Sequence, residues 1–439
     1  MADREKCAHL LRRAGFGPTA EEVDAAEKAG LAAAIEALVK PAGPDAGVAR
    51  TPVPTLGPDP YAALGKDASR EQKQQAKQAR REQIQTITAW WTDRMVAADH
   101  QLLEKLVFFW HGHWATSVQK VDSAHLMLAQ QEVFRRFGRG DFAPFVKAML
   151  RDAALIFWLD GQRNTRKAPN ENLARELMEL FTLGIGNYTE EDVKAGARAL
   201  TGWTIDRATR QVRFEPSRFD DGEKTILGAT GRFDADGFAD VLTSQPASGR
   251  FLAQRLWFRF ASGEPMPAEV GDRLVKAYGP GRDVSALLKA LFEDSAFQAT
   301  RSQLVKQPVE WVIGAMRQLG VRPSALTEQE SKQFLNGLAG LDQVVFRPPS
   351  VGGWPSGTQW LTTFSAQVRL RLAEGLAAKA ATANVDRLGA APVSGRPDAL
   401  ARLLVVDTWT DRTRKVLATA KDPRKMLALG LASPEYAVH

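Results

Sequence analysis

The chain has 439 residues, of which 44% are hydrophobic and 25% are charged, a composition that excludes a disordered protein. The length predicts two helical subdomains, which we place at residues 1–245 and 246–439. A net charge of +7, from 58 basic and 51 acidic residues, is too small an excess for a nucleic-acid-binding surface, so we expect no nucleic-acid partner.

The cysteine content and the N-terminal residues indicate the cellular compartment of the protein. A single cysteine, Cys7, excludes an internal disulfide and fits a reducing environment. Charged residues occupy the first positions, and no uninterrupted apolar stretch of a signal peptide follows them. No segment approaches the roughly 20 apolar residues that cross a bilayer. We therefore expect a soluble, cytoplasmic protein without a transmembrane segment.

Helix signals begin near the N-terminus. The spacing of Thr19 and Glu22 is that of a capping box, which predicts a helix start. Six prolines within residues 41–60 predict a loop. Residues 67–98 then read as one long helix, polar and basic in its first half and amphipathic in its second. The basic charges between Lys66 and Arg81 are expected to form a solvated helix face.

The next elements are also predicted to be helical. Asp99 is a plausible N-cap for a helix that ends near Gly112, and further helices are predicted at 119–136, 142–151, 171–183 and 190–201. Thr189 is expected to cap the last of these.

The periodicity changes between residues 210 and 228. Val212 and Phe214 alternate with polar residues, Asp220-Asp-Gly222 supplies a turn, and Thr225-Ile-Leu227 follows, which predicts one small β-hairpin. Helices resume from Asp236. The predicted fold class is mainly α: a multi-helical protein with one small β-hairpin near 210–228.

Two histidines lie at the end of the helix that contains Trp110. In a regular helix His111 and His113 point about 200° apart and cannot both bind one metal ion. If the helix ends at Gly112, an extended or left-handed residue brings both imidazoles to one side, as metal ligands. The alternative is that His113 is a hydrogen-bonded core residue and His111 is exposed.

The acidic helix at 171–183 separates an apolar face from a polar one. Glu176 and Glu179 share the polar face with Asn172, and two carboxylates beside imidazoles are the material of a metal site in a helical bundle. The alternative is a solvated face on which Arg175 pairs with Glu171 or Glu179. Other polar residues, including Asn170, gather at the start of this helix.

Several motifs occur together in a recognisable order. They are Leu10-Leu-Arg-Arg-Ala-Gly-Phe-Gly17, Phe109-Trp-His-Gly-His-Trp114, Pro169-Asn-Glu-Asn-Leu-Ala-Arg-Glu-Leu-Met-Glu-Leu-Phe-Thr-Leu-Gly184, Leu200-Thr-Gly-Trp203, Lys306-Gln-Pro-Val-Glu-Trp311 and Phe346-Arg-Pro-Pro-Ser-Val-Gly-Gly-Trp-Pro355. Through them the chain resembles the family catalogued as domain of unknown function 1800 along almost its whole length.

The resemblance implies a helical bacterial protein and, as a partner, a member of the family catalogued as domain of unknown function 1501. Many members carry export signals, whereas we expect none in this chain. Members typically have a histidine before the Asp-Asp-Gly turn, where this chain has Phe219, and an asparagine at the position of Gly112. Asp220 and Lys224 match the family, and Lys224 is therefore a further candidate binding residue.

These observations lead to one functional hypothesis and one alternative. The hypothesis is a metal- or ligand-dependent enzyme with Glu176, Glu179 and Arg175 as catalytic residues and with Asn170, Asn172 and Lys224 binding the cofactor or substrate. A divalent transition metal would be held by His111, His113, Glu176 and Glu179. The alternative is a non-catalytic helical scaffold or partner-binding protein, in which the same polar groups hold the helices in register.

Overall fold

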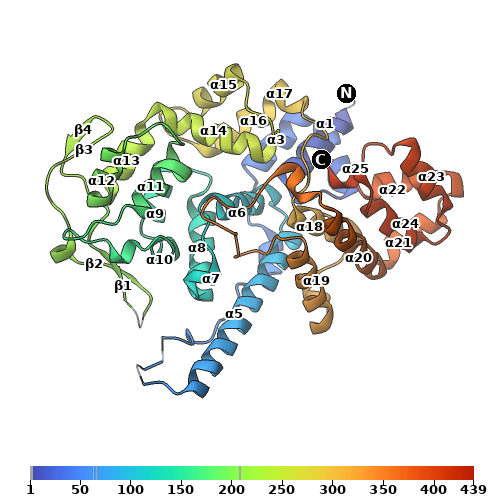
Figure 1. Cartoon of the computed structure of the whole chain (residues 1–439). Coiled ribbons are helices and arrows are strands. Elements are labelled where there is room, and N and C mark those ends of the chain that lie inside the picture. The colour runs from blue at the N-terminus through green and yellow to red at the C-terminus, as the bar shows by residue number, and fades with distance from the viewer. Residues whose placement is uncertain (1–2, 63, 66, 207–208) are drawn as a thin grey trace.

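The computed structural model describes residues 3–62, 64–65, 67–206 and 209–439, and most of them are helical (Figure 1). The predicted mainly-α fold is confirmed. The first part of the chain contains α1 (Asp3–Ala14), α2 (Ala20–Ala29), α3 (Leu31–Val39), α4 (Ala46–Ala49), α5 (Arg70–Ala97), α6 (Gln101–His113), α7 (Val118–Val121), α8 (Ala124–Phe137), α9 (Phe142–Met149) and α10 (Ala153–Trp158).

The acidic segment and the strands follow. This part contains the short 3₁₀ helix η1 (Gly161–Arg163), α11 (Asn172–Glu176), the π-helix η2 (Leu177–Thr182), α12 (Glu190–Ala199), β1 (Trp203–Ile205), β2 (Val212–Phe214), the 3₁₀ helix η3 (Pro216–Arg218), β3 (Lys224–Ile226) and β4 (Ala229–Gly231).

Helices make up the remainder. They are α13 (Ala235–Ser244), α14 (Pro246–Phe260), α15 (Ala268–Tyr278), α16 (Val284–Glu293), α17 (Ser295–Gln298), α18 (Pro308–Leu319), η4 (Pro323–Ala325), α19 (Glu328–Gly340), η5 (Gly357–Trp360), α20 (Thr363–Lys379), α21 (Thr382–Ala390), η6 (Val393–Gly395), α22 (Arg396–Leu403), α23 (Asp411–Thr419), α24 (Pro423–Leu431) and α25 (Pro434–Ala437).

Most predicted helix starts are confirmed, with one exception. Thr19 and Thr189 each form a capping box. Asp99 is not the N-cap of α6: the helix begins after His100, which makes no side-chain cap. The Asp99 carboxylate instead accepts hydrogen bonds from Arg50 (3.0 Å) and from the backbone N–H of Gly47 (3.1 Å), because the proline-rich loop packs against this corner.

The predicted helix at 119–136 is two helices. Asp122 has a left-handed backbone conformation (φ 62°), which ends α7, and Ser123 then caps α8. Helix α5 is a single long helix, as predicted, and its first half extends away from the body of the protein (Figure 1).

The predicted β segment forms two hairpins rather than one. Strand β2 pairs with β1, with Val212 opposite Ile205, and β3 pairs with β4, with Ile226 opposite Ala229, both antiparallel. The strands at 212–214 and 224–226 are therefore present, but they pair with neighbours outside the predicted hairpin. Asp220 separates the two segments, because its backbone N–H donates to the Thr201 hydroxyl (2.8 Å) and its carboxylate pairs with Arg198 of α12 (2.7 Å).

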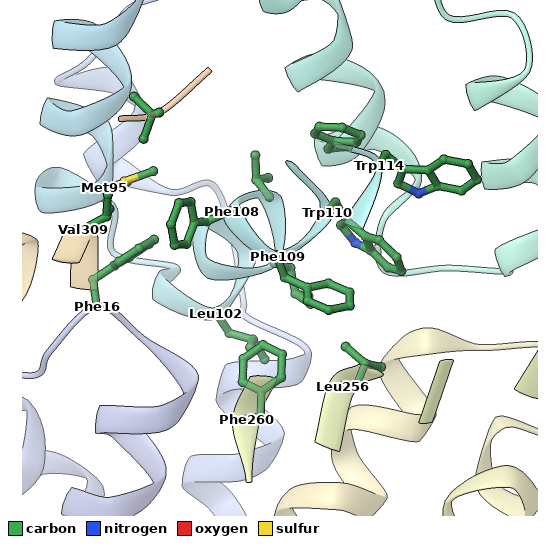
Figure 2. Close-up of a cluster of buried hydrophobic side chains, with 14 of the residues drawn as sticks. Phe16, Met95, Leu102, Phe108, Phe109, Trp110, Trp114, Leu256, Phe260 and Val309 are labelled. Atoms are coloured by element: carbon green, nitrogen blue, oxygen red, sulfur yellow. The ribbon is translucent and has the colours of Figure 1, made fainter. Parts of the chain in front are cut away.

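Helix α6 lies in the hydrophobic core. Figure 2 shows Phe108 and Trp110 of α6 among side chains from distant parts of the chain, including Phe16 before α2, Phe260 of α14 and Val309 of α18. One contiguous cluster of buried hydrophobic residues extends from Leu10 to Tyr436. The division into subdomains at residues 245 and 246 stays a prediction.

The two ends of the chain lie close together (Figure 1). The imidazole Nδ1 of His439 is 3.1 Å from the carbonyl oxygen of Arg12, and the backbone N–H of Lys306 donates to Ala437 (2.9 Å). Among the helices of the described ranges, none is long and apolar enough to cross a membrane.

Candidate functional site

The two histidines of α6 face different surroundings. The helix continues through Gly112 to His113, so the break that would bring the imidazoles together is absent. His111 Nε2 accepts a hydrogen bond from the backbone N–H of Phe346 (3.0 Å), and its ring packs against Trp91 and Trp354. His113 Nε2 lies 2.9 Å from the carbonyl oxygen of Phe181. His111 is fully buried, not exposed as the alternative interpretation expected.

These contacts determine the tautomers. A carbonyl oxygen only accepts, so His113 carries its proton on Nε2 and has a lone pair on Nδ1. His111 accepts at Nε2 and therefore carries its proton on Nδ1. Burial lowers the pKa of each imidazole to about 3, with the positive charge of Arg255 adding to the effect at His113. Both rings are neutral near pH 7.

The acidic helix changes its hydrogen-bonding pattern at Leu177. Helix α11 continues as the π-helix η2, in which the N–H of Leu183 donates to Met178 (2.9 Å) and the Thr182 hydroxyl donates to Leu177 (2.6 Å). π-Helical turns are rare and occur frequently at functional sites. This turn carries Glu179, and it also holds the Phe181 carbonyl that His113 contacts.

Glu176, at the end of α11, and Glu179, on the π-helical turn, differ in their contacts. Glu179 Oε2 accepts a short hydrogen bond from the Tyr188 hydroxyl (2.6 Å). Burial and this bond raise the pKa of Tyr188 to about 12. Burial, followed by the negative charge of Glu179, raises the pKa of Glu176. Within the described ranges no side chain hydrogen-bonds to the Glu176 carboxylate or forms an ion pair with it.

A cavity of about 480 Å³ adjoins this turn. His113 and Glu179 both line it, so one predicted histidine and one predicted carboxylate belong to the same site. Residues of α14 form its opposite wall, with Arg255 and Phe251 facing it. A second cavity of about 300 Å³ shares His113, Arg255 and Gly352 with the first and continues toward Trp354.

Arg255 is the unusual group of this site. In the part of the chain that the structure describes, no acceptor hydrogen-bonds to its guanidinium and no carboxylate forms an ion pair with it. Burial lowers the pKa of Arg255. Arg259, one turn later on α14, contrasts with it, because its guanidinium lies 3.0 Å from the Glu310 carboxylate. Arg255 is therefore a largely buried cation that faces a cavity without a counter-charge.

The loop at residues 350–356 closes the site against α6. Gly353 has φ +84°, and a Cβ atom there would lie 2.3 Å from the carbonyl oxygen of Gly112. Only a glycine allows the two backbones to approach this closely. The contact places Gly352 in the wall of both cavities, next to His113.

The remaining predicted site residues lie elsewhere. Arg175 forms ion pairs with Glu171 (3.0 Å) and Glu190 (2.7 Å) on the surface. Asn170 accepts a hydrogen bond at its side chain from the backbone N–H of Asn172 (3.0 Å), as a helix-start contact. None of these groups lines the cavity of His113 and Glu179.

Lys224 is also a structural residue of its own loop. Its ammonium donates to the carbonyl oxygens of Asp220 (2.7 Å) and Gly222 (2.8 Å) and lies 5.3 Å from the centre of the Phe219 ring. Asp220 in turn pairs with Arg198 (2.7 Å). The turn that the family resemblance singled out is thus held by ion pairs and hydrogen bonds of its own.

The predicted set of four metal ligands does not come together. Across residues 3–62, 64–65, 67–206 and 209–439, no three His, Cys, Asp or Glu side chains lie close enough to hold a metal ion. His111 faces Phe346 on the other side of α6, and the Nε2 atom of His113 is occupied by Phe181. The geometry therefore supports a ligand cavity better than a metal centre.

Sequence reasoning missed the contribution of α14. The relevant signal is Arg255, followed one turn later by Arg259, within the mostly apolar stretch Phe251–Phe260. Charged residues at i and i+4 in such a stretch are either paired in the interior or exposed to a ligand. The sequence does not say which, since the partner of Arg259 is 51 positions away in α18.

Comparison with known proteins gives one result. Residues 9–438 match a family described as protein of unknown function, DUF1800. No curated protein and no solved structure matches the chain.

Proposed function

The chain belongs to the DUF1800 family, and from the cavity at α14 we propose that it binds a small organic anion, whose charged group pairs with Arg255. The observation that carries the proposal is the unpaired, largely buried guanidinium facing a cavity of about 480 Å³. This volume is in the range of small-molecule sites.

Electrostatics supports an anion rather than a neutral ligand. A buried charge without a partner costs several kcal/mol of desolvation free energy, of order 3–5 kcal/mol when a partner is removed from a buried pair. Several buried arginines have carboxylate partners: Arg94 and Arg135 share Glu104, and Arg259 contacts Glu310. Arg13 and Arg369 lack a carboxylate but donate to backbone carbonyl oxygens, whereas no hydrogen bond to the Arg255 guanidinium is present in the described chain. A ligand carboxylate or phosphate at Arg255 would complete the site in the same way, with bidentate geometry available.

The rest of the cavity indicates the shape of the ligand. Phe251, Leu180 and Leu183 offer an apolar wall. The Glu179 carboxylate and the unpaired Nδ1 of His113 are acceptors, and they favour a ligand that carries a hydroxyl or amine donor away from its anionic group. We propose a hydroxy acid or amino acid of moderate size as the ligand class.

The same site offers an acid–base pair if the bound molecule reacts. The Tyr188 hydroxyl donates a hydrogen bond of 2.6 Å to the Glu179 carboxylate, which fixes the position of a group that can accept a proton from the ligand. We propose this pair, and not the histidines, as the proton-transferring group of an enzyme, because a pKa of about 3 makes His113 a weak base. The DUF1501-family partner stays a proposal from family resemblance.

The test compares each of two organic acids with its own neutral amide, so that the two probes of a pair differ mainly in charge. Phenyllactate and 4-hydroxyphenylacetate, with their neutral amides, are titrated by calorimetry into the full-length protein and into the variants Arg255→Gln and Arg250→Gln. Arg250 lines the same cavity but is exposed and pairs with Asp272 (2.6 Å), so it is the matched control. We expect the acids to bind and the amides not to, with affinity reduced at least tenfold by Arg255→Gln and less than threefold by Arg250→Gln.

Two outcomes would contradict the proposal. If the acids and amides bind equally, or if Arg255→Gln retains full affinity, the guanidinium does not select an anion. If no probe binds and Arg255→Leu raises the melting temperature, the arginine is a buried group without a ligand, and the scaffold interpretation is favoured.

A further inference from the structure

Lys306 lies in the motif Lys306-Gln-Pro-Val-Glu-Trp311. It does not line the cavity of about 480 Å³ that contains Arg255, which we call the α14 cavity. It precedes α18, and its backbone N–H donates to Ala437 near the end of the chain (2.9 Å). The side chain is buried, with 7% of the residue exposed. Its amine nitrogen lies 3.6 Å from the centre of the Tyr436 ring.

Lys306 differs from the other buried lysine next to it. Lys105 contacts the Glu310 carboxylate and donates to the Gly15 carbonyl (2.8 Å). No carboxylate pairs with Lys306 in the described ranges of the chain, and no oxygen accepts a hydrogen bond from its amine. Asp407, which lines the same cavity as Lys306, is already bound in bidentate fashion by Arg12 (2.8 and 2.9 Å).

The side chain opens onto a cavity of about 250 Å³. Hydroxyl groups of Ser302, Thr408 and Thr410 line this cavity together with Glu435. It is separate from the α14 site, with which it shares no lining residue. A desolvated amine beside a cationic group, with room for a small molecule in front of it, is the arrangement that activates lysine as a nucleophile.

We propose that Lys306 is a nucleophilic amine that forms an imine with a small aldehyde or ketone in this cavity. The Nζ lone pair attacks the carbonyl carbon and forms a C–N bond. The carbonyl oxygen takes up two protons and leaves as water, while the nitrogen gives up both of its protons, one of them exchanged through solvent, and a neutral C=N bond remains. Hydroxyl groups on the cavity wall can pass these protons, and no oxidant or reductant is needed.

The surroundings of Lys306 favour the neutral amine that this step requires. Burial, followed by the positive charge of Arg12, holds the pKa of Lys306 well below its usual range. An exposed lysine with a pKa of about 10.4 is neutral in roughly 0.1% of molecules at pH 7.4. An anion site would need the opposite property, a lysine that stays charged, so the carbonyl compound is the better match.

Reductive methylation of the native full-length chain tests the proposal. The protein is treated at pH 7 with ¹³C-formaldehyde and cyanoborohydride, which traps the imine, and modification is followed by peptide mass spectrometry over time. Lys415 and Lys425, on the exposed faces of α23 and α24, are the internal references. We expect Lys306 to react at least tenfold faster than either reference in the native protein, and to lose this advantage in urea.

The Lys306→Met variant tests whether the fast reaction depends on the Lys306 amine. In Lys306→Met the reference lysines should react unchanged, which shows that the probe is active, and an unchanged thermal melt shows that the variant is folded. The proposal is wrong if Lys306 in the native protein is unmodified or reacts no faster than Lys415. It is also wrong if inorganic phosphate binds and protects Lys306 while the ¹³C resonance of the dimethylamine shows an ordinary lysine titration, because the site then holds an anion.

Discussion

The ammonium of Lys105 contacts the carboxylate of Glu310 in the interior, although the two residues are 205 positions apart. The Arg259 guanidinium lies 3.0 Å from the same carboxylate, and the backbone N–H of Gln307 donates to it (2.8 Å). The Glu310 carboxylate on α18 therefore neutralises two buried cations, Lys105 of α6 and Arg259 of α14.

We predict that Glu310→Gln destabilises the fold strongly. The substitution leaves Lys105 and Arg259 buried without a counter-charge, which typically costs about 3–5 kcal/mol of unfolding free energy. Urea unfolding followed by circular dichroism measures the change. Glu328→Gln breaks the exposed pair with Lys332 and serves as the control, with little change in the urea midpoint. Equal midpoints for the two variants would contradict the prediction.

Stability should fall in mild acid because of four buried histidines, His9, His111, His113 and His439, whose pKa values are all lowered by burial. Burial lowers the pKa of His9, His111 and His113 to about 3, below the value of about 6.5 in the unfolded chain. The unfolded state therefore binds more protons between these values. Stability is fully present above pH 6.5 and decreases as the pH falls toward 3, by about 1.4 kcal/mol per pH unit for each histidine.

The measurement is urea unfolding at several values between pH 7.5 and 4.5. His111→Gln should flatten the dependence, since it removes one of the four buried histidines. A midpoint that stays constant down to pH 4.5 would show that the imidazoles are not buried in neutral form.

The two faces of the π-helical segment should respond differently to substitution. Leu177 is fully buried, so Leu177→Ala is expected to cost about 2–5 kcal/mol. Glu179→Gln keeps the shape and still accepts the Tyr188 hydroxyl, so we expect a loss of roughly 1 kcal/mol or less. Thermal melts of both variants measure this difference. A larger loss for Glu179→Gln would favour a buried structural network over a binding site.

Gly353 should be intolerant of any side chain. Alanine there would place Cβ 2.3 Å from the Gly112 carbonyl oxygen and would also occupy a left-handed conformation. Gly357→Ala is the matched control, because Gly357 has φ +65° and open space around it, so it carries only the left-handed cost of about 1–2 kcal/mol. Gly353→Ala should lower the melting temperature further and weaken binding of the organic acids, since the displaced loop carries Gly352.

The basic half of α5 should not bind nucleic acid tightly. Lys73, Lys77 and Arg81 are exposed, Arg80 pairs with Asp122, and Lys66 lies outside the described residues. Fluorescence anisotropy with labelled DNA and RNA at physiological salt should give no sub-micromolar affinity. Tight binding that is lost in Lys73→Gln/Lys77→Gln would contradict this expectation.

Local chemistry explains what the sequence determined by itself. Capping boxes at Thr19 and Thr189 and the amphipathic period of α5 depend on residues within one or two turns, so they predict helix positions directly. The strands at 212–214 and 224–226 were also recognisable from alternation. Their pairing was not, because Asp220, between the two strands, is bound to Thr201 and to Arg198 of α12.

The site was decided by tertiary contacts. The sequence singled out His113 and Glu179, but it could not show that His111 faces away, that Arg175 pairs with Glu190, or that Arg255 has no partner. Whether a buried charged side chain is neutralised depends on whether an oppositely charged side chain lies beside it. In this protein that partner is tens to hundreds of residues away in the sequence, as for Lys105 and Glu310. Periodicity and spacing describe a residue's own element, whereas pairing and burial arise only when the elements pack together.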